Sequence, residues 1–122
     1  MIVRSGIDTI EISRLNEVRP EIRSRFIQRV FTSKEIEQAR DRDDVLSGLF
    51  AAKEAVSKAL GTGIGYVAWQ DIEILHLNSG QPFVHLHGHA EITANRLGLK
   101  DWSVSISHDR NKAIALAVAI GE

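Results

Sequence analysis

Cysteine is absent from the 122 residues of this sequence. Its absence excludes disulfide bonds, thiolate catalysis and cysteine-ligated zinc. The sequence also lacks an apolar signal core at its start, and its longest apolar run, residues 113–120, falls well short of the roughly 20 residues that cross a bilayer. Together these absences predict a soluble, cytoplasmic protein that has no membrane partner.

Excess charge of either sign is missing as well. The formal net charge is −1, which argues against a general nucleic-acid binder. The composition, 43% hydrophobic and 25% charged, is typical of a globular protein, and we find neither an internal repeat nor a disordered segment. At this length we expect one domain, residues 1–122, with a single core.

Hydrophobic periodicity predicts an α+β fold in which a small antiparallel sheet packs with one long and several short helices. Alternation indicates strands at residues 1 to about 8, 71–77, 83–87, 102–108 and 113–120, and the last two should be antiparallel neighbours. Ser13 suits a helix N-cap, Pro20 suits the first position of the next helix, and residues 32–35 have capping-box spacing. We expect a loop at residues 41–44, the long helix at residues 45–60 and a further helix at residues 88–97.

Two segments carry acids of potential chemical interest: residues 6–8 (Gly-Ile-Asp) and residues 50–58 on the long helix. A hard divalent cation prefers oxygen ligands and is often held by one or two carboxylates plus substrate phosphates. Asp8 and Glu54 would serve, yet Glu54 and Lys58 at i, i+4 also form an ordinary surface pair worth about 0.3–0.5 kcal/mol. Asp8 alone would pass as a polar residue that closes a strand, so spacing by itself favours surface residues.

The combination of motifs changes this interpretation. The two acidic segments, the glycine loop at residues 61–64 (Gly-Thr-Gly-Ile) and residues 105–108 (Ser-Ile-Ser-His) resemble, in order and spacing, the holo-acyl-carrier-protein synthase family. This family is the single-copy bacterial type of 4'-phosphopantetheinyl transferase. Length and the predicted hairpin, with Asp-Ile-Glu-Ile at residues 71–74 and Gly-Gln-Pro at residues 80–82, match too, so the resemblance covers nearly the whole chain and implies the family's fold.

The resemblance implies an enzyme that transfers 4'-phosphopantetheine from coenzyme A to a serine hydroxyl of apo acyl carrier protein, with release of adenosine 3',5'-bisphosphate. It also implies a requirement for Mg²⁺ and a place in fatty acid biosynthesis, although the sequence leaves open whether the carrier protein is of fatty-acid or polyketide type. The family's single-copy members form homotrimers with shared active sites, and the alanine-rich final strand is compatible with close packing between subunits.

Site residues follow from the same resemblance. Asp8 and Glu54 match the magnesium ligands, and Glu54 and Lys58 match the catalytic pair, Lys58 facing the pyrophosphate charge. The positions that match coenzyme A contacts are Lys53, Lys58, Gly61, Gly63, Ser107 and His108. The proton of the carrier serine must pass to a base, and Glu54, Asp8 through a metal-bound water, and Lys58 all remain candidates.

Carrier-protein docking is predicted from local charge. Residues 14–29 hold five arginines against two acids, and such a patch would steer an acidic partner. Charge runs more often mark a solvated helix face, but the resemblance favours docking by Arg14 and Arg25, with Phe26 as an apolar neighbour. One departure stands out, because Leu49 occupies the position where many family members have an arginine, and we expect weaker or rearranged binding of the 3'-phosphate.

A second function belongs to a different class. His85, His87 and His89 form a His-x-His-x-His run, which would suit zinc or copper in a non-catalytic metal-binding protein. On a strand, however, His85 and His87 share one face, which is also the pattern of a half-exposed strand. Residue spacing favours the solvated face.

Overall fold

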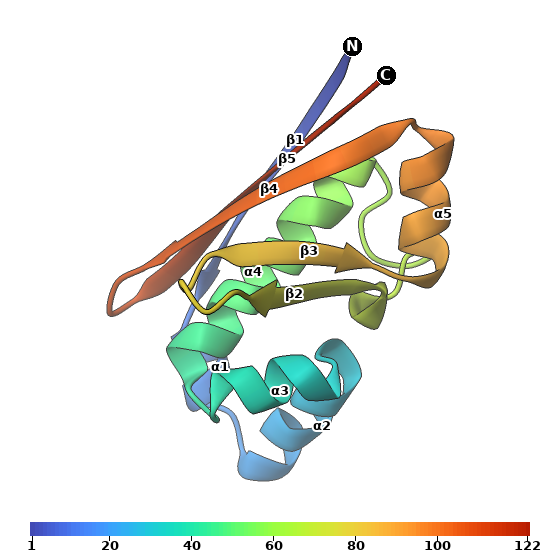
Figure 1. The fold of residues 1–122 in the computed structure, drawn as a ribbon. Coiled ribbons are helices and arrows are strands. Elements are labelled where there is room, and N and C mark those ends of the chain that lie inside the picture. The colour runs from blue at the N-terminus through green and yellow to red at the C-terminus, as the bar shows by residue number, and fades with distance from the viewer.

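A long helix lies across the inner face of a three-stranded antiparallel sheet, and shorter helices and a β-hairpin surround it (Figure 1). The computed structural model describes all residues 1–122. In chain order the elements are β1 (Ile2–Glu11), α1 (Ser13–Asn16), α2 (Pro20–Val30), α3 (Ser33–Ala39), α4 (Asp43–Leu60), the 3-10 turn η1 (Trp69–Asp71), β2 (Ile72–His76), β3 (Pro82–Leu86), α5 (Gly88–Arg96), β4 (Leu99–His108) and β5 (Lys112–Gly121). The predicted α+β class is confirmed.

The three-stranded sheet has the order β1-β5-β4, with β5 in the centre. Asp8 pairs with Ala115 on one side of β5, and Ile106 pairs with the same alanine on the other. The strands β4 and β5 are antiparallel neighbours, as the short connection between them predicts. The hairpin β2–β3 forms a separate two-stranded sheet beside β4 (Figure 1).

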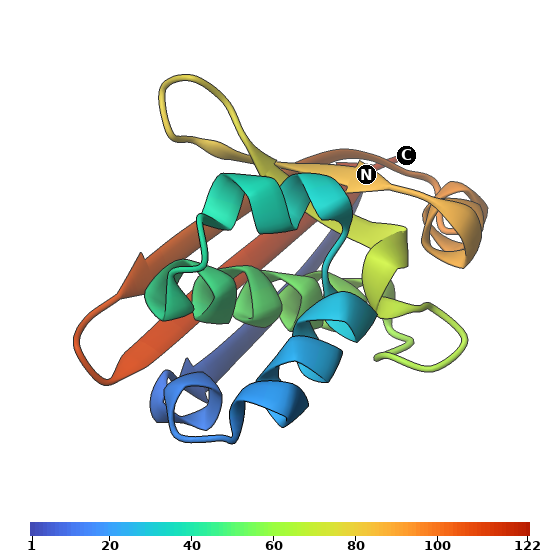
Figure 2. The same ribbon diagram turned by 90° about the horizontal axis from the view of Figure 1, so that it is seen from below.

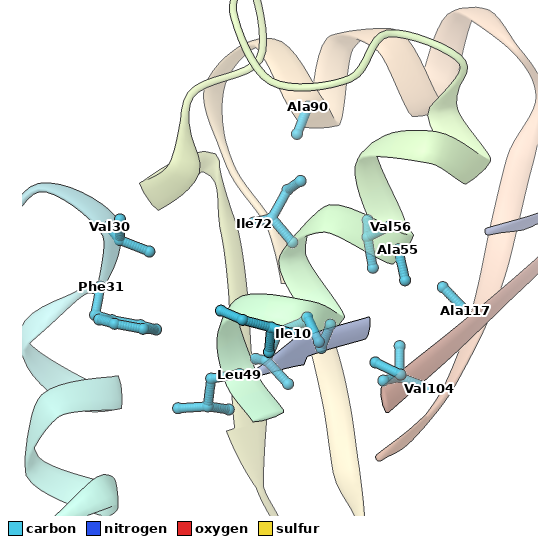
Figure 3. Packing of buried hydrophobic residues seen from close by; sticks show 14 of the residues in the cluster. Ile10, Val30, Phe31, Leu49, Ala55, Val56, Ile72, Ala90, Val104 and Ala117 are labelled. Atoms are coloured by element: carbon cyan, nitrogen blue, oxygen red, sulfur yellow. The ribbon is translucent and has the colours of Figure 1, made fainter. Parts of the chain in front are cut away.

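Small side chains allow α4 to lie close to the sheet. Four alanines of β5 (Ala113, Ala115, Ala117 and Ala119) are buried and face α4. In Figure 3, Ala55 and Val56 of α4 lie between Ala117 of β5 and Ile72 of β2. The alanine-rich strand therefore packs closely within the core of the single chain.

The outer face of the sheet is uncovered within one chain. On β5 the side chains that alternate with the alanines include Ile114, Leu116 and Ile120, all exposed, and Val3 and Ile7 of β1 are exposed opposite them. The register places Ile7 across from Leu116. A folded chain thus presents a band of apolar side chains along two neighbouring strands, which is called the outer apolar face below.

The short helices close the opposite side of α4, so that α4 lies between the sheet and the layer of α2 and α3 (Figure 2). Phe26 of α2 packs on Phe50 of α4, with ring centroids 5.5 Å apart. Helix α3 begins with the predicted capping box between Thr32 and Glu35, and the Glu35 carboxylate also accepts a hydrogen bond from the Ile74 amide of β2. This bond satisfies a backbone donor on the edge of the hairpin.

Several predicted boundaries differ from the structure by one to three residues; strand β4, for example, begins at Leu99 rather than at residue 102. Strand β1 continues to Glu11, because its pairing with β5 continues to Lys112. Ile12, not Ser13, is the N-cap of α1, and no side chain caps it. Helix α4 begins at Asp43 within the predicted loop, where two aspartates in its first turn suit the positive end of the helix dipole. His87 lies just past β3 as the N-cap of α5.

None of the helices combines the length and hydropathy that crossing a membrane requires.

Candidate active site

The central feature of the site is the contact between β1 and α4. A Cβ atom at Gly6 would collide with the carbonyl of Ala55, so only glycine allows the strand to lie this close to the helix. Asp8 is two residues farther along β1 and therefore faces the same way, toward α4. Gly6 thus brings Asp8 within reach of α4, which explains the Gly-Ile-Asp segment physically.

Glu54 faces Asp8 from α4, and it is half-buried. Burial raises the pKa of the Glu54 carboxyl, the negative charge of Asp8 raises this pKa further, and the Lys58 ammonium opposes both effects. Two carboxylates therefore share one cation. The two carboxylates repel each other, and binding of a further cation would reduce this repulsion.

Lys58 provides that one cation. Its ammonium donates hydrogen bonds to Asp8 Oδ1 at 3.1 Å and to the Ile7 carbonyl at 2.9 Å. The Lys58 side chain is 51% exposed, so it can turn toward a bound anion without unfolding the helix. The structure thus brings together Asp8, Glu54 and Lys58, three residues that the family resemblance placed in one site, and this group is called the acid–lysine cluster below.

The glycine loop starts where α4 ends, one turn beyond Lys58. Gly61 ends the helix with φ 81°, and the Ser57 carbonyl accepts hydrogen bonds from the amides of Thr62 and Gly63. Arg4 of β1 donates to the Ala59 carbonyl, and its guanidinium lies against Gly61. Sequence reasoning missed Arg4, since nothing in a strand sequence reveals that the residue meets a helix end.

An open depression of about 460 Å³ adjoins the acid–lysine cluster. Ile10 lines it from β1, two residues after Asp8, and Phe50 lines it from α4, one turn before Glu54. The remaining lining residues are Ser13, Arg14, Leu15, Glu17, Val18, Ile22 and Phe26. Two of the three predicted docking residues, Arg14 and Phe26, therefore border an apolar depression next to the acids.

The arginine patch is smaller in the structure than in the sequence. Arg23 binds Asp41 and Asp43, which raises the pKa of its guanidinium, and Arg19 pairs with Glu21. The other three arginines of the patch (Arg14, Arg25 and Arg29) are exposed and form no ion pair. These three arginines therefore carry the unpaired positive charge of the patch.

The structure corrects the prediction for Lys53. Its side chain is 0% exposed, and its ammonium contacts Glu35 Oε1 at 2.8 Å and donates to the carbonyls of Trp69 and Ile72. Burial lowers the pKa of the Lys53 ammonium, and the Glu35 carboxylate opposes that shift. A lysine sealed in the core cannot contact coenzyme A, so Lys53 holds α4 against α3 and η1.

Ser107 and His108 lie apart from the acid–lysine cluster within one chain. Ser107 is on the outward side of β4, away from α4. His108 approaches Asp44 in the first turn of α4, with Nε2 4.0 Å from Oδ2. Asp44 precedes Glu54 by about 15 Å of helix rise. A single chain therefore does not bring Ser107 and His108 together with the acid–lysine cluster.

Leu49 is 1% exposed and belongs to the hydrophobic core. Its side chain packs inside the protein. The position at which the resemblance implies an arginine therefore contributes to the hydrophobic core in this chain.

The three histidines of the run do not converge, as the alternative metal-binding function would require. His85 and His87 are neighbours, with ring centroids 4.4 Å apart, but His89 stacks on Tyr66 and bonds the Tyr66 carbonyl at 2.8 Å. Glu73 of β2 takes the third place beside His85 and His87. The alternative site built from His85, His87 and His89 is therefore wrong in its third residue.

Comparison with known proteins identifies a family. The model of the 4'-phosphopantetheinyl transferase superfamily matches residues 4–118. The holo-[acyl-carrier-protein] synthase of Herpetosiphon aurantiacus is 44% identical over 96% of this chain and 98% of its own length. The corresponding synthase of Natranaerobius thermophilus is 43% identical over 97% of both chains.

Solved structures agree with the sequence relatives. The Helicobacter pylori holo-[acyl-carrier-protein] synthase in complex with coenzyme A has a TM-score of 0.86 and 32% identity, over 95% of this chain and 99% of that one. The Bacillus anthracis synthase in complex with coenzyme A (3',5'-ADP) has a TM-score of 0.80 and 33% identity, over 100% and 99%. The likeness in fold therefore extends along both chains.

Proposed function

Because the chain belongs to the 4'-phosphopantetheinyl transferase superfamily, we propose that it transfers 4'-phosphopantetheine from coenzyme A to a serine hydroxyl of apo acyl carrier protein. The observation that carries the proposal is the acid–lysine cluster, which unites Asp8, Glu54 and Lys58 beside an apolar depression. The reaction serves fatty acid biosynthesis in the cytoplasm.

The chemistry is a phosphoryl-group substitution. The serine oxygen forms a bond to the phosphorus that carries the pantetheine arm, and the bond from this phosphorus to the bridging oxygen of the pyrophosphate breaks. Adenosine 3',5'-bisphosphate leaves with that oxygen, and the hydroxyl proton passes to a base. Positioning and charge stabilisation supply most of the catalysis in reactions of this kind.

The acid–lysine cluster fits a hard divalent cation, since its donors are carboxylate oxygens and its two acids share one ammonium. Asp8 and Glu54 would hold Mg²⁺, which when bound supplies positive charge against the pyrophosphate. Lys58, exposed beside them, would face the phosphate charge. Gly61 and Gly63, one turn beyond Lys58, would lie along coenzyme A.

The remaining predicted contacts support a site shared between subunits. Ser107 and His108 lie away from the acid–lysine cluster in their own chain, so they would reach coenzyme A from a neighbouring subunit. The outer apolar face gives such an oligomer a surface to bury. We propose a homotrimer on this basis.

Mass spectrometry tests the transfer directly. With Mg²⁺ and coenzyme A, the protein should add one phosphopantetheine to an apo acyl carrier protein of fatty-acid or polyketide type. Asp8→Ala and Glu54→Ala should each abolish the transfer while circular dichroism shows an intact fold. Unmodified carrier proteins of both types, in the presence of a folded enzyme, would disprove the activity, and wild-type rates in both variants would disprove the site.

Docking of the carrier protein is the second part of the proposal. Exposed Arg14 and Arg25, with Phe26 in the depression, offer positive charge and apolar surface to an acidic partner. We predict that Arg14→Glu raises the apparent KM for carrier protein several-fold and leaves that for coenzyme A nearly unchanged, as steady-state kinetics would measure.

Arg19→Glu is the control for this prediction, because Arg19 is already paired with Glu21. An equal rise in both KM values for Arg14→Glu, or an equal effect of the control, would show that the carrier protein docks elsewhere.

A further inference from the structure

A second cluster of ligand-type side chains lies on the outer side of the β2–β3 hairpin. It consists of Glu73, His85 and His87, whose nearest ligand atoms all lie within 4.8 Å of one another. His87 Nε2 is 3.1 Å from Glu73 Oε1, and His85 Nδ1 is 4.0 Å from the same oxygen. None of these residues belongs to the acid–lysine cluster or to the predicted coenzyme A contacts.

Strand register creates the cluster. Glu73 of β2 is paired directly with His85 of β3, so their side chains project from the same face of the hairpin. His87 follows His85 by two residues and faces the same way. The opposite face of the hairpin carries Ile72 and Ile74, which are buried in the core. Backbone geometry, rather than flexible loops, thus sets three ligand atoms near one point.

The carboxylate is held in place from behind. Glu73 is 5% exposed, and its Oε2 accepts a hydrogen bond of 2.6 Å from the hydroxyl of Thr32. The same threonine caps α3, so it is itself fixed. Such an outer partner orients a metal-binding carboxylate and leaves the other oxygen, Oε1, to bind the ion. The amide of His87 donates to the Asp71 carbonyl at 2.8 Å, which fixes the end of the strand.

The donor set selects the ion. Two imidazoles and one carboxylate suit Zn²⁺, whose bonds to these ligands are about 2.0–2.2 Å, whereas Mg²⁺ prefers oxygen alone. Ligand atoms in a tetrahedral zinc site are then about 3.3 Å apart, and the His87–Glu73 separation already has that size. The side chains of His85 and His87 are 57% and 44% exposed, so the ion has an open path and solvent can occupy a fourth position.

We propose that Glu73, His85 and His87 form a zinc-binding site on the β2–β3 hairpin. The site is separate from the acid–lysine cluster in residues, location and preferred ion, and it does not depend on the transferase activity. Because its ligands come from both strands and its supporting threonine from α3, bound zinc links the hairpin to the helical layer.

Zinc titration of chelator-treated, metal-free protein by isothermal calorimetry tests the proposal. We expect one zinc ion per chain, with the affinity reduced at least tenfold by His85→Ala, by His87→Ala and by Glu73→Gln, because each substitution removes one of the three ligand atoms. His89→Ala is the matched control, because it removes a histidine from the same run but from outside the site. Asp8→Ala should also keep the zinc affinity and so separates the two clusters.

Co²⁺ used as a spectroscopic substitute reports geometry independently of stability. Wild-type protein should give the intense visible bands of a four-coordinate site, and His87→Ala should lose them while circular dichroism stays unchanged. The melting temperature of the wild type should rise with added zinc, as ligand linkage requires. Absence of stoichiometric zinc binding, or an equal loss of affinity in His89→Ala, would overturn the proposal and leave Glu73–His87 an ordinary hydrogen bond.

Discussion

Glu54 is the residue whose charge governs the acid–lysine cluster. Its pKa is raised by burial and by Asp8, so its carboxylate is protonated at a higher pH than that of a free glutamate. The Mg²⁺ binding proposed for Asp8 and Glu54 would require the ionised form. The affinity for Mg²⁺ should therefore rise with pH until the solution is above the pKa of Glu54, and then level off.

The interaction between Asp8 and Glu54 can be tested with the substitution Asp8→Asn. Removing the negative charge of Asp8 removes one cause of the raised pKa, so the pKa of Glu54 should fall toward its ordinary value, while Lys58 remains to stabilise the carboxylate. NMR titration of the side-chain carboxyl carbon of Glu54 measures this shift. A pKa that stays unchanged in the variant would show that Asp8 and Glu54 do not interact.

Ser47 provides a second prediction at this scale. Its hydroxyl is fully buried and has no hydrogen-bond partner. A buried polar group without a partner costs about 1–3 kcal/mol. We predict that Ser47→Ala increases the free energy of unfolding by about 1 kcal/mol in urea denaturation.

Ser57→Ala is the matched control. This serine is equally buried in the same helix, but its hydroxyl donates to the Glu54 carbonyl at 2.7 Å. Both substitutions gain the same helix propensity from alanine. If the two variants were stabilised equally, propensity rather than the unpaired hydroxyl would be the cause.

At the scale of elements, one buried ion pair joins α4, α3 and the hairpin. Lys53 of α4 contacts Glu35 of α3, and the same Glu35 accepts the amide of Ile74 from β2. The ammonium also lies over the ring of Phe31, 5.7 Å from its centroid. Three elements are thus held by two charged side chains in the core.

We predict that Lys53→Met lowers the free energy of unfolding by about 3–5 kcal/mol, because it leaves the Glu35 carboxylate buried without its partner. The double variant Lys53→Met/Glu35→Gln should recover part of this loss, since the buried charge is then gone. Urea denaturation of the wild type, the single variant and the double variant measures these free energies. Lys34 is an exposed lysine on α3, so the control variant Lys34→Met should change the free energy of unfolding little.

Sequence patterns predicted where the helices and strands lie more reliably than they predicted which side chains are exposed to solvent. The periodicity, the capping box at Thr32 and the stop at Gly61 all have local causes, and the structure confirms them. Lys53 could not be told from Lys58 in this way, because α4 is buried on most of its circumference and both lysines neighbour the same glutamate. Which lysine meets solvent depends on where α3 docks.

The sequence predicted which strands of the two hairpins are neighbours but not the register of their pairing. The hairpin at residues 71–87 was predicted, but the pairing of Glu73 with His85 depends on the register that the turn selects. The resemblance to a family placed Asp8 with Glu54, yet the collision that a side chain at Gly6 would cause is visible only when β1 lies on α4. Such facts are properties of packing, not of local pattern.

At the scale of the whole molecule, the outer apolar face is the feature that a single chain leaves unexplained. Ile7 and Leu116 are cross-strand neighbours, 55% and 43% exposed, in the middle of this face. Apolar patches of this kind commonly mark subunit interfaces. A charge placed there would lose its hydration on assembly without gaining a partner.

We therefore predict that Leu116→Glu converts the proposed homotrimer to monomers, as light scattering coupled to size-exclusion chromatography would show. Transfer activity should fall with it if the site is shared. Leu77→Glu is the control, because Leu77 is 51% exposed but lies beyond β2, away from this face. A variant at Leu116 that keeps the wild-type mass would place the interface on another surface.

The close contact at Gly6 has an evolutionary consequence. The two acids of the site come from the strand and the helix that this contact joins, 46 positions apart in the chain. A mutation that spoils the spacing between them also damages the core, and the protein is lost before a misaligned site can persist. A chain that folds with β1 against α4 therefore also fixes the spacing of its two acids, so selection for folding acts on the geometry of the site as well.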